Sequence, residues 1–254
     1  MKEIKTIFFD IDGTLIPFKE TKVPKEVLEA IQMAKKKGYK VGLATSRPMT
    51  LIQRAENIFE IEWDGIVASS GTKLYDGQCH LLKEHSLPLS VQESIFHIAD
   101  QNQIAIYTCG NESYFTKESD IISWFKDTYQ LECDSFHPYN HKETELITLL
   151  GDNQDWIRKL YSKIEEIRFV KGGTYNLDIF PAQINKMTGI HEFMKSWGFH
   201  PQDYLCFGDT QGDHEMILDA QIGIAMPKSS QDTKEIADFV CQDIPSALRH
   251  FHII

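Results

Sequence analysis

The chain has 254 residues, 42% of them hydrophobic and 25% charged, which is the composition of a globular protein with one large or two modest domains. Its net charge of −11 disfavours nucleic-acid binding, because an acidic surface repels a phosphate backbone. The sequence has no run of about 18 apolar residues and no signal-peptide pattern at its start, so we expect a cytoplasmic protein without a membrane span.

The first third of the chain alternates predicted strands with predicted helices. Ile4–Asp10 is a short run rich in isoleucine and phenylalanine, which is typical of a buried strand. Pro24–Lys37 is predicted to be a helix, since proline suits a first turn and a glycine follows the last. We further expect a strand at Tyr39–Ala44, a helix at Met49–Phe59 and a strand at Gly65–Ala68. This alternation predicts a parallel sheet with helices on its faces.

The middle of the chain follows another order, α-β-β-α-β-α-β-β. The segments that give this order are Ser90–Gln101, Ile104–Thr108, Ser113–Thr116, Ser119–Tyr129, Glu145–Leu150, Asp152–Ile164, Ile167–Val170 and Tyr175–Phe180. Short turns between neighbouring strands predict an antiparallel sheet with helices on one face. We therefore expect residues 84–182 to form an inserted α+β domain.

The end of the chain returns to the first style. Its predicted elements are Lys186–Trp197, Tyr204–Phe207, Gln211–Ala220, Ile222–Met226, Asp232–Ala237, Phe239–Cys241 and Asp243–Phe251, which alternate between helix and strand. The sequence thus predicts an α/β fold, with a discontinuous Rossmann-like core at residues 1–83 and 183–254.

The first candidate site lies directly after the first predicted strand, in the run Asp10–Leu15. Ligands of open parallel sheets bind beyond the carboxyl ends of the strands, where Asp10 and Asp12 are placed. Gly13 lets the backbone turn and approach a ligand closely. Two nearby carboxylates repel, so we expect a cation beside Asp10 and a shared proton on Asp12. The alternative is a common Asp-Gly turn after a strand.

The second candidate site is Asp209 and Asp213, which follow another predicted strand. Spaced four residues apart, the two side chains can lie on one face of a helix start. With Asp10 they offer the hard oxygen ligands that Mg²⁺ prefers. An acidic helix cap is the structural alternative.

Two further segments supply hydroxyls and positive charge. Thr45-Ser46-Arg47 ends the second predicted strand, and its hydroxyls and backbone N–H groups are suited to phosphate oxygens. Lys186 begins a predicted helix, and its ammonium group can neutralise a phosphate.

Together these four segments resemble the motifs of the haloacid dehalogenase-like (HAD) superfamily. The middle block is similar to the large α/β cap, of the C2B type, that the Cof-type phosphatases of that superfamily carry. The resemblance implies that Asp10 is the nucleophile, Asp12 the general acid and base, and Lys186 a further catalytic group. It also implies Mg²⁺ held by Asp10, the Asp12 carbonyl, Asp209 and Asp213, with phosphate oxygens held by the side chains of Thr45, Ser46 and Lys186.

The sequence departs from the pattern of that branch at four places. Ser46 and Met187 each stand where the branch usually has glycine, and Gly212 stands where it usually has asparagine. Pro227-Lys228 stands where it often has Gly-Asn. None of these changes removes one of the four candidate acids.

The resemblance implies a phosphatase for a small phosphorylated metabolite, such as a sugar phosphate or a nucleotide-like cofactor. A phosphosugar mutase or phosphotransferase is one alternative, and a weakened phospholigand-binding regulator is another. Separately, Cys133, His137 and His141 follow one another at intervals of four residues, a spacing at which their side chains can bind a transition metal. Pro138 interrupts any helix through these residues. The oligomeric state is not indicated.

Overall fold

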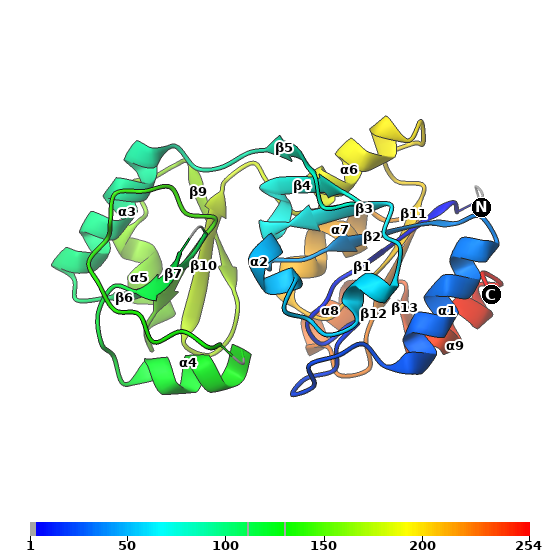
Figure 1. Cartoon of the computed structure of the whole chain (residues 1–254), viewed down its shortest axis with the longest axis horizontal. Coiled ribbons are helices and arrows are strands. Elements are labelled where there is room, and N and C mark those ends of the chain that lie inside the picture. The colour runs from blue at the N-terminus through cyan, green and yellow to red at the C-terminus, as the bar shows by residue number, and fades with distance from the viewer. Residues whose placement is uncertain (1–3, 111, 130) are drawn as a thin grey trace. The chain divides into compact units, whose positions relative to one another are not determined.

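The computed structural model describes residues 4–110, 112–129 and 131–254. The chain divides into two compact units, shown in Figure 1. Unit 1 consists of Met1–Glu84 and Asn185–Ile254, and unit 2 of His85–Ile184. The sequence had placed these two boundaries at residues 83/84 and 182/183.

Unit 1 contains an eight-stranded sheet in the order β13-β12-β11-β1-β2-β3-β4-β5 among the described residues. The strands are β1 (Thr6–Phe9), β2 (Lys40–Ala44), β3 (Gly65–Ala68), β4 (Lys73–Asp76), β5 (Leu81–Glu84), β11 (Tyr204–Gly208), β12 (Ile222–Ala225) and β13 (Phe239–Val240). From β13 to β3 neighbouring strands are parallel, whereas β4 and β5 join antiparallel. The predicted parallel core sheet is confirmed, and the β4–β5 hairpin is an addition that the sequence analysis missed.

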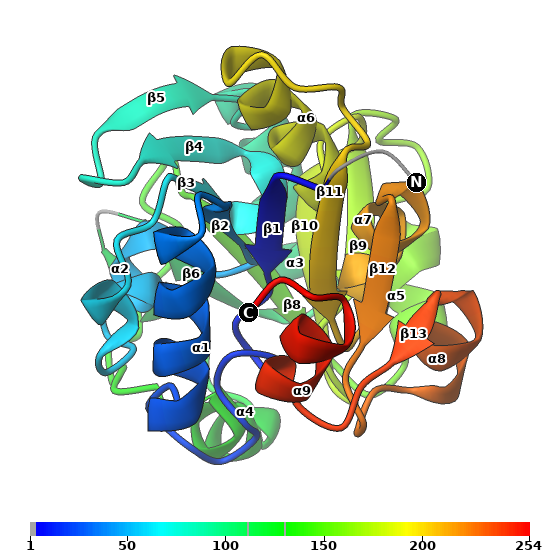
Figure 2. The ribbon, with the colours of Figure 1, turned by 90° about the vertical axis from the view of Figure 1, so that its right-hand side faces the viewer.

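Helices cover both faces of this sheet. They are α1 (Lys25–Lys36), α2 (Met49–Ile52), α6 (Lys186–Ser196), α7 (His214–Asp219), α8 (Gln231–Ile236) and α9 (Ile244–His250), with short 3-10 segments η1 (Ile58–Glu60), η2 (Ser69–Gly71) and η3 (Gln211–Asp213). Successive side chains of β1 point to opposite faces. Ile7 and Phe9 therefore pack with α1 and α9, while Phe8 packs with α6 and α7. Figure 2 shows α1 and α9 on the same face of the sheet.

The described residues of unit 2 form a five-stranded antiparallel sheet in the order β7-β6-β8-β10-β9. Its elements are α3 (Leu89–Gln101), β6 (Ala105–Cys109), β7 (Ser113–Phe115), α4 (Ile121–Tyr129), β8 (Leu146–Leu150), α5 (Gln154–Leu160), β9 (Ile167–Lys171) and β10 (Asn176–Pro181). Their order is the predicted one. A separate apolar core, which includes Ile95, Leu149 and Ile157, lies between this sheet and the helices α3 and α5.

Two details of the predicted elements are wrong. The helix α4 does not share the face of α3 and α5, because its Phe125 packs on Tyr107 and Phe115, which point to the other face of the sheet. The predicted helix Met49–Phe59 is reduced to α2 and η1. Between them, Asn57 exchanges hydrogen bonds with the backbone of Val23, with distances of 2.9 and 3.0 Å, so tertiary contacts replace helical ones.

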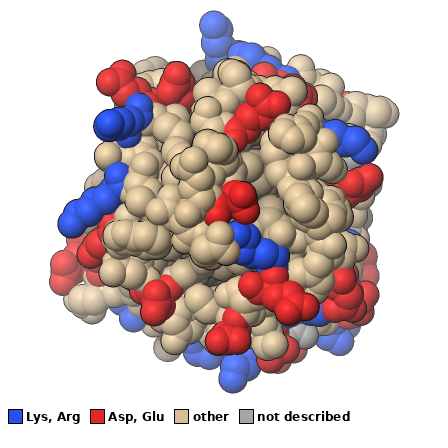
Figure 3. Space-filling view, turned by 90° about the vertical axis from the view of Figure 1, so that its left-hand side faces the viewer, with Lys and Arg blue, Asp and Glu red and all other residues tan. Residues whose placement is uncertain are grey.

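Charged side chains of both signs are interspersed with uncharged ones across the face drawn in Figure 3. None of the helices in the described parts of the chain is both long and apolar enough to cross a membrane.

Candidate active site

The sheet brings together two acidic residues that are 199 positions apart in the chain. The strand β1 pairs in parallel with β11, and Phe9 lies opposite Phe207. Asp10 follows β1, and Asp209 follows β11. The backbone N–H of Asp10 donates to the carbonyl of Phe207 at 3.0 Å, which extends the pairing to the site itself. The carboxyl ends of the two strands therefore place both acids at one edge of the sheet.

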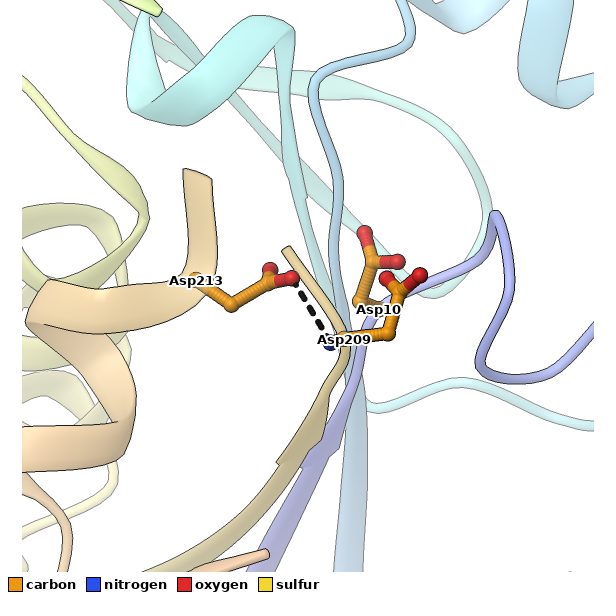
Figure 4. Close-up of side chains that lie close together, drawn as sticks. All are labelled: Asp10, Asp209 and Asp213. Carbon is orange, nitrogen blue, oxygen red and sulfur yellow. Dashed lines mark hydrogen bonds between the residues drawn. The ribbon is translucent and has the colours of Figure 1, made fainter. Parts of the chain in front are cut away.

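Three carboxylates converge at this edge. Oxygens from Asp10, Asp209 and Asp213 lie within 4.8 Å of one another, and all three side chains are buried. Figure 4 shows the Asp10 and Asp209 carboxylates next to each other, with Asp213 facing them from another segment. It is the only group of three such ligands found in the described residues. The geometry therefore offers a cation site made of hard oxygen ligands.

Lys186 lies between two of these acids. Its Nζ atom is 2.6 Å from Asp10 Oδ1 and 2.6 Å from Asp213 Oδ1, and the side chain is buried. Lys186 is the first residue of α6, which begins with a capping box. In that box Thr188 N donates to Asn185 Oδ1 at 2.9 Å, and Asn185 N donates to Thr188 Oγ1 at 3.0 Å. The cap thus fixes the backbone that carries the lysine.

The two carboxylate oxygens of Asp213 have different hydrogen-bond partners. While Oδ1 accepts from Lys186, Oδ2 accepts from the backbone N–H groups of Asp209 and Thr210, each at 3.0 Å. The predicted helix from Gln211 instead starts as the 3-10 turn η3, so Asp213 reaches back to the strand end. Its contacts make it a support for Lys186 and for the loop that carries Asp209.

Asp209 differs from Asp213 in having an oxygen without a hydrogen bond. Its Oδ1 atom is buried and has no partner among the described residues. A buried carboxylate oxygen without a donor is unfavourable unless a cation or proton satisfies it. This atom is the best evidence that the site fits a divalent metal ion.

The electrostatics of the cluster point the same way. Burial, opposed by Lys186 and reinforced by Asp213 and Asp12, raises the pKa of Asp10 to about 7. Burial and the neighbouring Asp10 raise the pKa of Asp209 to about 9. Burial alone would lower the pKa of Lys186, but the attraction of Asp10 and Asp213 raises it above its usual value. Lys186 thus stays charged, whereas the raised pKa values of Asp10 and Asp209 show that the positive charge around them is too small to balance both carboxylates.

Gly13 allows the chain to pass close to the acids. Its φ is 78°, in the left-handed region that favours glycine. A Cβ atom on this residue would lie 2.2 Å from Oδ2 of Asp209. Any larger residue would therefore displace the Asp209 carboxylate.

The predicted phosphate segment Thr45-Ser46-Arg47 lies beyond the end of the neighbouring strand β2. Thr45 is buried, and its Oγ1 atom accepts from the N–H of Arg47 at 3.1 Å. The hydroxyl of Ser46 is 2.8 Å from that of Ser70, on η2. The hydroxyl-bearing residues of this segment therefore follow the strand next to Asp10.

Asp12 has a partner that sequence reasoning did not assign. Arg47 donates from Nε and Nη2 to the two oxygens of Asp12, at 2.8 and 2.5 Å. The sequence led us to expect a shared proton on Asp12, and the structure shows a two-point ion pair with Arg47 at a side chain that is 48% exposed. Burial lowers the pKa of Arg47, but the pairing with Asp12 outweighs this and raises it. The four segments contain more acidic than basic residues, and this excess could have indicated that Arg47 pairs with one of the acids.

Cys133, His137 and His141 each have a separate partner. Cys133 Sγ donates to the carbonyl of Ser113 at 3.3 Å, the His137 ring stacks on Tyr114, and His141 Nδ1 lies 3.4 Å from a carboxylate oxygen of Glu93. These contacts give no support to a metal site there.

Comparison with known proteins identifies similar chains. A family model described as haloacid dehalogenase-like hydrolase matches residues 7–246. A Streptococcus pyogenes protein, whose name joins a phosphatase to a peptidyl-prolyl cis-trans isomerase, is 27% identical over 247 residues. The match covers 96% of this chain but only 52% of that protein. The Bacillus subtilis 5-amino-6-(5-phospho-D-ribitylamino)uracil phosphatase YcsE is 22% identical over 259 residues, which are 98% of this chain and 96% of that protein.

The fold also has solved counterparts. The HAD subclass IIB sugar phosphatase BT4131 aligns with a TM-score of 0.87 at 23% identity, covering 98% of this chain and all of that one. At this identity the likeness establishes the fold, including the inserted unit.

Proposed function

Since this chain belongs to the haloacid dehalogenase-like hydrolases, we propose that it is a Mg²⁺-dependent phosphatase that hydrolyses small phosphate monoesters through a phosphorylated Asp10. The observation that carries this proposal is the buried cluster of Asp10, Asp209, Asp213 and Lys186. It combines a nucleophilic carboxylate, a lysine for a phosphate oxygen and acids suited to a divalent cation.

The roles follow from the contacts of each side chain. Asp10 attacks phosphorus, forming an acyl phosphate as the bond to the leaving oxygen breaks. Lys186, 2.6 Å from Asp10, lies where it can also hold a phosphoryl oxygen. Thr45 and Ser46 supply further hydrogen bonds to the phosphoryl group. A water molecule then hydrolyses the acyl phosphate and regenerates the Asp10 carboxylate.

Asp12 acts as the general acid in the first step and as the general base in the second. In the first step it gives a proton to the leaving oxygen, and in the second it takes one from the attacking water. Its two-point ion pair with Arg47 holds the carboxylate in position at the site. The partial exposure of this side chain allows it to exchange its proton with solvent.

The metal would be held by Asp10 and Asp209, with the Asp12 carbonyl and Asp213 completing or supporting the site. Once bound, Mg²⁺ would screen the repulsion between the Asp10 carboxylate and the negatively charged phosphoryl group. When all four acids are ionised, the positive charges of Lys186 and Arg47 do not balance them, and the net charge of the site is negative. A cation is therefore needed before an anionic substrate can bind.

The substrate class rests on the relatives. The similar B. subtilis protein is named for a phosphorylated ribityl-pyrimidine, and BT4131 is called a sugar phosphatase. A sugar phosphate or a nucleotide-like cofactor is therefore the class we propose for this chain.

The test is a phosphatase assay on a panel of such metabolites, with Mg²⁺ and with a chelator. We expect turnover only with the metal, and loss of turnover by at least about a thousandfold in Asp10→Asn with an unchanged melting temperature in the presence of Mg²⁺. Asp100→Asn, an exposed aspartate in unit 2, is the matched control and should keep full activity. Turnover by Asp10→Asn at the normal rate would exclude Asp10 as nucleophile, while binding without turnover would favour a regulator.

A further inference from the structure

Phe18 is an exposed aromatic side chain close to the candidate active site. It is 56% exposed, whereas the other phenylalanines of this part of the chain, Phe8 and Phe9, are fully buried. A single exposed apolar side chain is unremarkable on a protein surface. The position of Phe18 and the backbone that holds it distinguish it from such cases.

The Phe18 ring lies against the acidic cluster. Its Cζ atom is 2.7 Å from the point where a Cβ on Gly13 would sit, and Oδ2 of Asp209 is 2.2 Å from the same point. The ring tip and the Asp209 carboxylate therefore lie on the same side of Gly13 and close to one another. Since more than half of this residue is exposed, it offers an apolar surface beside a group of charges.

A constrained turn holds this ring in place. Glu20 N donates to the carbonyl of Pro17 at 3.0 Å, which closes a turn with Phe18 and Lys19 at its centre. Lys19 has a φ of 72°, in the left-handed region that is unfavourable for a residue with a side chain. Backbone strain of this kind gathers at functional sites. Proline at the start of the turn further restricts the approach of the chain to Phe18.

We infer that Phe18 contacts the leaving group of the substrate and favours phosphate esters whose leaving group carries a ring. This inference rests on the proposed phosphatase function. The charged and hydroxyl groups of the site serve the phosphoryl end, while Phe18 provides a flat apolar face next to it. Contact between an aromatic ring and a second ring strengthens binding by about twofold to about tenfold beyond the effect of the area it buries.

Two substrates isolate this contact. p-Nitrophenyl phosphate has a ring in its leaving group, and acetyl phosphate does not. Both leaving groups depart with little need of a proton, so the role of Asp12 does not confound the comparison. For Phe18→Ala we expect kcat/KM to fall about fivefold on p-nitrophenyl phosphate and to stay within about twofold on acetyl phosphate. Phe18→Tyr, which keeps the ring, should keep both values.

The matched control is Phe59→Ala, which removes another exposed phenylalanine of unit 1, 40% exposed, from η1. It should leave both substrates unaffected. Equal losses on the two substrates in Phe18→Ala would overturn the inference, because a purely structural role gives that result. An unchanged kcat/KM on p-nitrophenyl phosphate would overturn it as well. If the unaltered protein hydrolyses neither substrate with Mg²⁺, the proposed function itself fails.

Discussion

Two groups of ion pairs, one around Lys186 and one between Arg47 and Asp12, differ in how deeply they are buried. Lys186 is buried, with Asp10 and Asp213 each at 2.6 Å, and its loss would leave two buried carboxylates without a compensating charge. Arg47 and Asp12 form their pair nearer to solvent, where it can open at lower cost. The Lys186 group suits the nucleophilic role that we propose for Asp10, and the Arg47–Asp12 pair suits the acid–base role that we propose for Asp12.

The raised pKa values of Asp10 and Asp209 make stability depend on pH in a definite direction. Both acids hold a proton more tightly in the folded protein than in the unfolded chain, where their pKa is near 3.8. Their contribution to the free energy of unfolding therefore falls as pH rises from about 4 through about 7 for Asp10, and on to about 9 for Asp209.

We predict that, without metal, Asp10→Asn gains stability relative to the unaltered protein as pH rises from about 5 to about 8. Urea unfolding in the presence of a chelator measures this difference. Saturating Mg²⁺ should reduce it, because a bound cation replaces the protons. If the free energies of unfolding of the two proteins change with pH in parallel, burial does not raise the pKa of Asp10.

At the scale of single elements, the helix α6 matters most to the site. Its first residue is Lys186, and its start is fixed by the capping box of Asn185 and Thr188. Helix stability and lysine position therefore depend on the same two hydrogen bonds.

We predict that Asn185→Ala lowers the free energy of unfolding by about 1 kcal/mol and also lowers kcat. Asn153 provides a matched control, since its side chain accepts from Trp156 N at 3.0 Å to cap α5 in unit 2. Asn153→Ala should show a similar loss of stability, measured by urea unfolding, with kcat unchanged. Equal kcat values for the two variants would mean that the cap does not position Lys186.

The elements that carry the site were the most predictable from sequence. Short apolar strands followed by Asp10 and Asp209 are local patterns, and a helix opening at Lys186 is local as well. Predictions were wrong where distant contacts decide, as for α2, whose predicted length is cut by the hydrogen bonds between Asn57 and Val23. The Arg47–Asp12 pair was missed for the same reason, because it joins residues 35 positions apart. The hairpin strand β5 gave no alternating pattern, since all its residues are exposed.

At the scale of the whole molecule, each unit has an apolar core of its own. Unit 2 is one continuous segment, and buried residues such as Ile106, Leu149 and Leu177 form its core. A contiguous segment of this size with its own core has what independent folding requires.

We predict that residues 85–184, produced alone, unfold in one cooperative transition with a free energy of at least about 5 kcal/mol. Circular dichroism during urea unfolding measures this. In the same fragment Leu149→Ala, at a fully buried position, should lower the free energy of unfolding by about 2–5 kcal/mol. A broad transition that this substitution leaves unchanged would mean that the core forms only in the full chain.

The junction between Ile184 and Asn185 has a consequence for exchanging the inserted unit. The carbonyl of Ile184 accepts from Arg168 Nε at 2.6 Å, and the next residue already caps the helix of Lys186. No spacer separates the insert from the helix that begins with Lys186. A chimaera that receives a different insert must therefore be joined before Asn185. The other junction, at Glu84, ends an exposed edge strand, so the exact joining position matters less there.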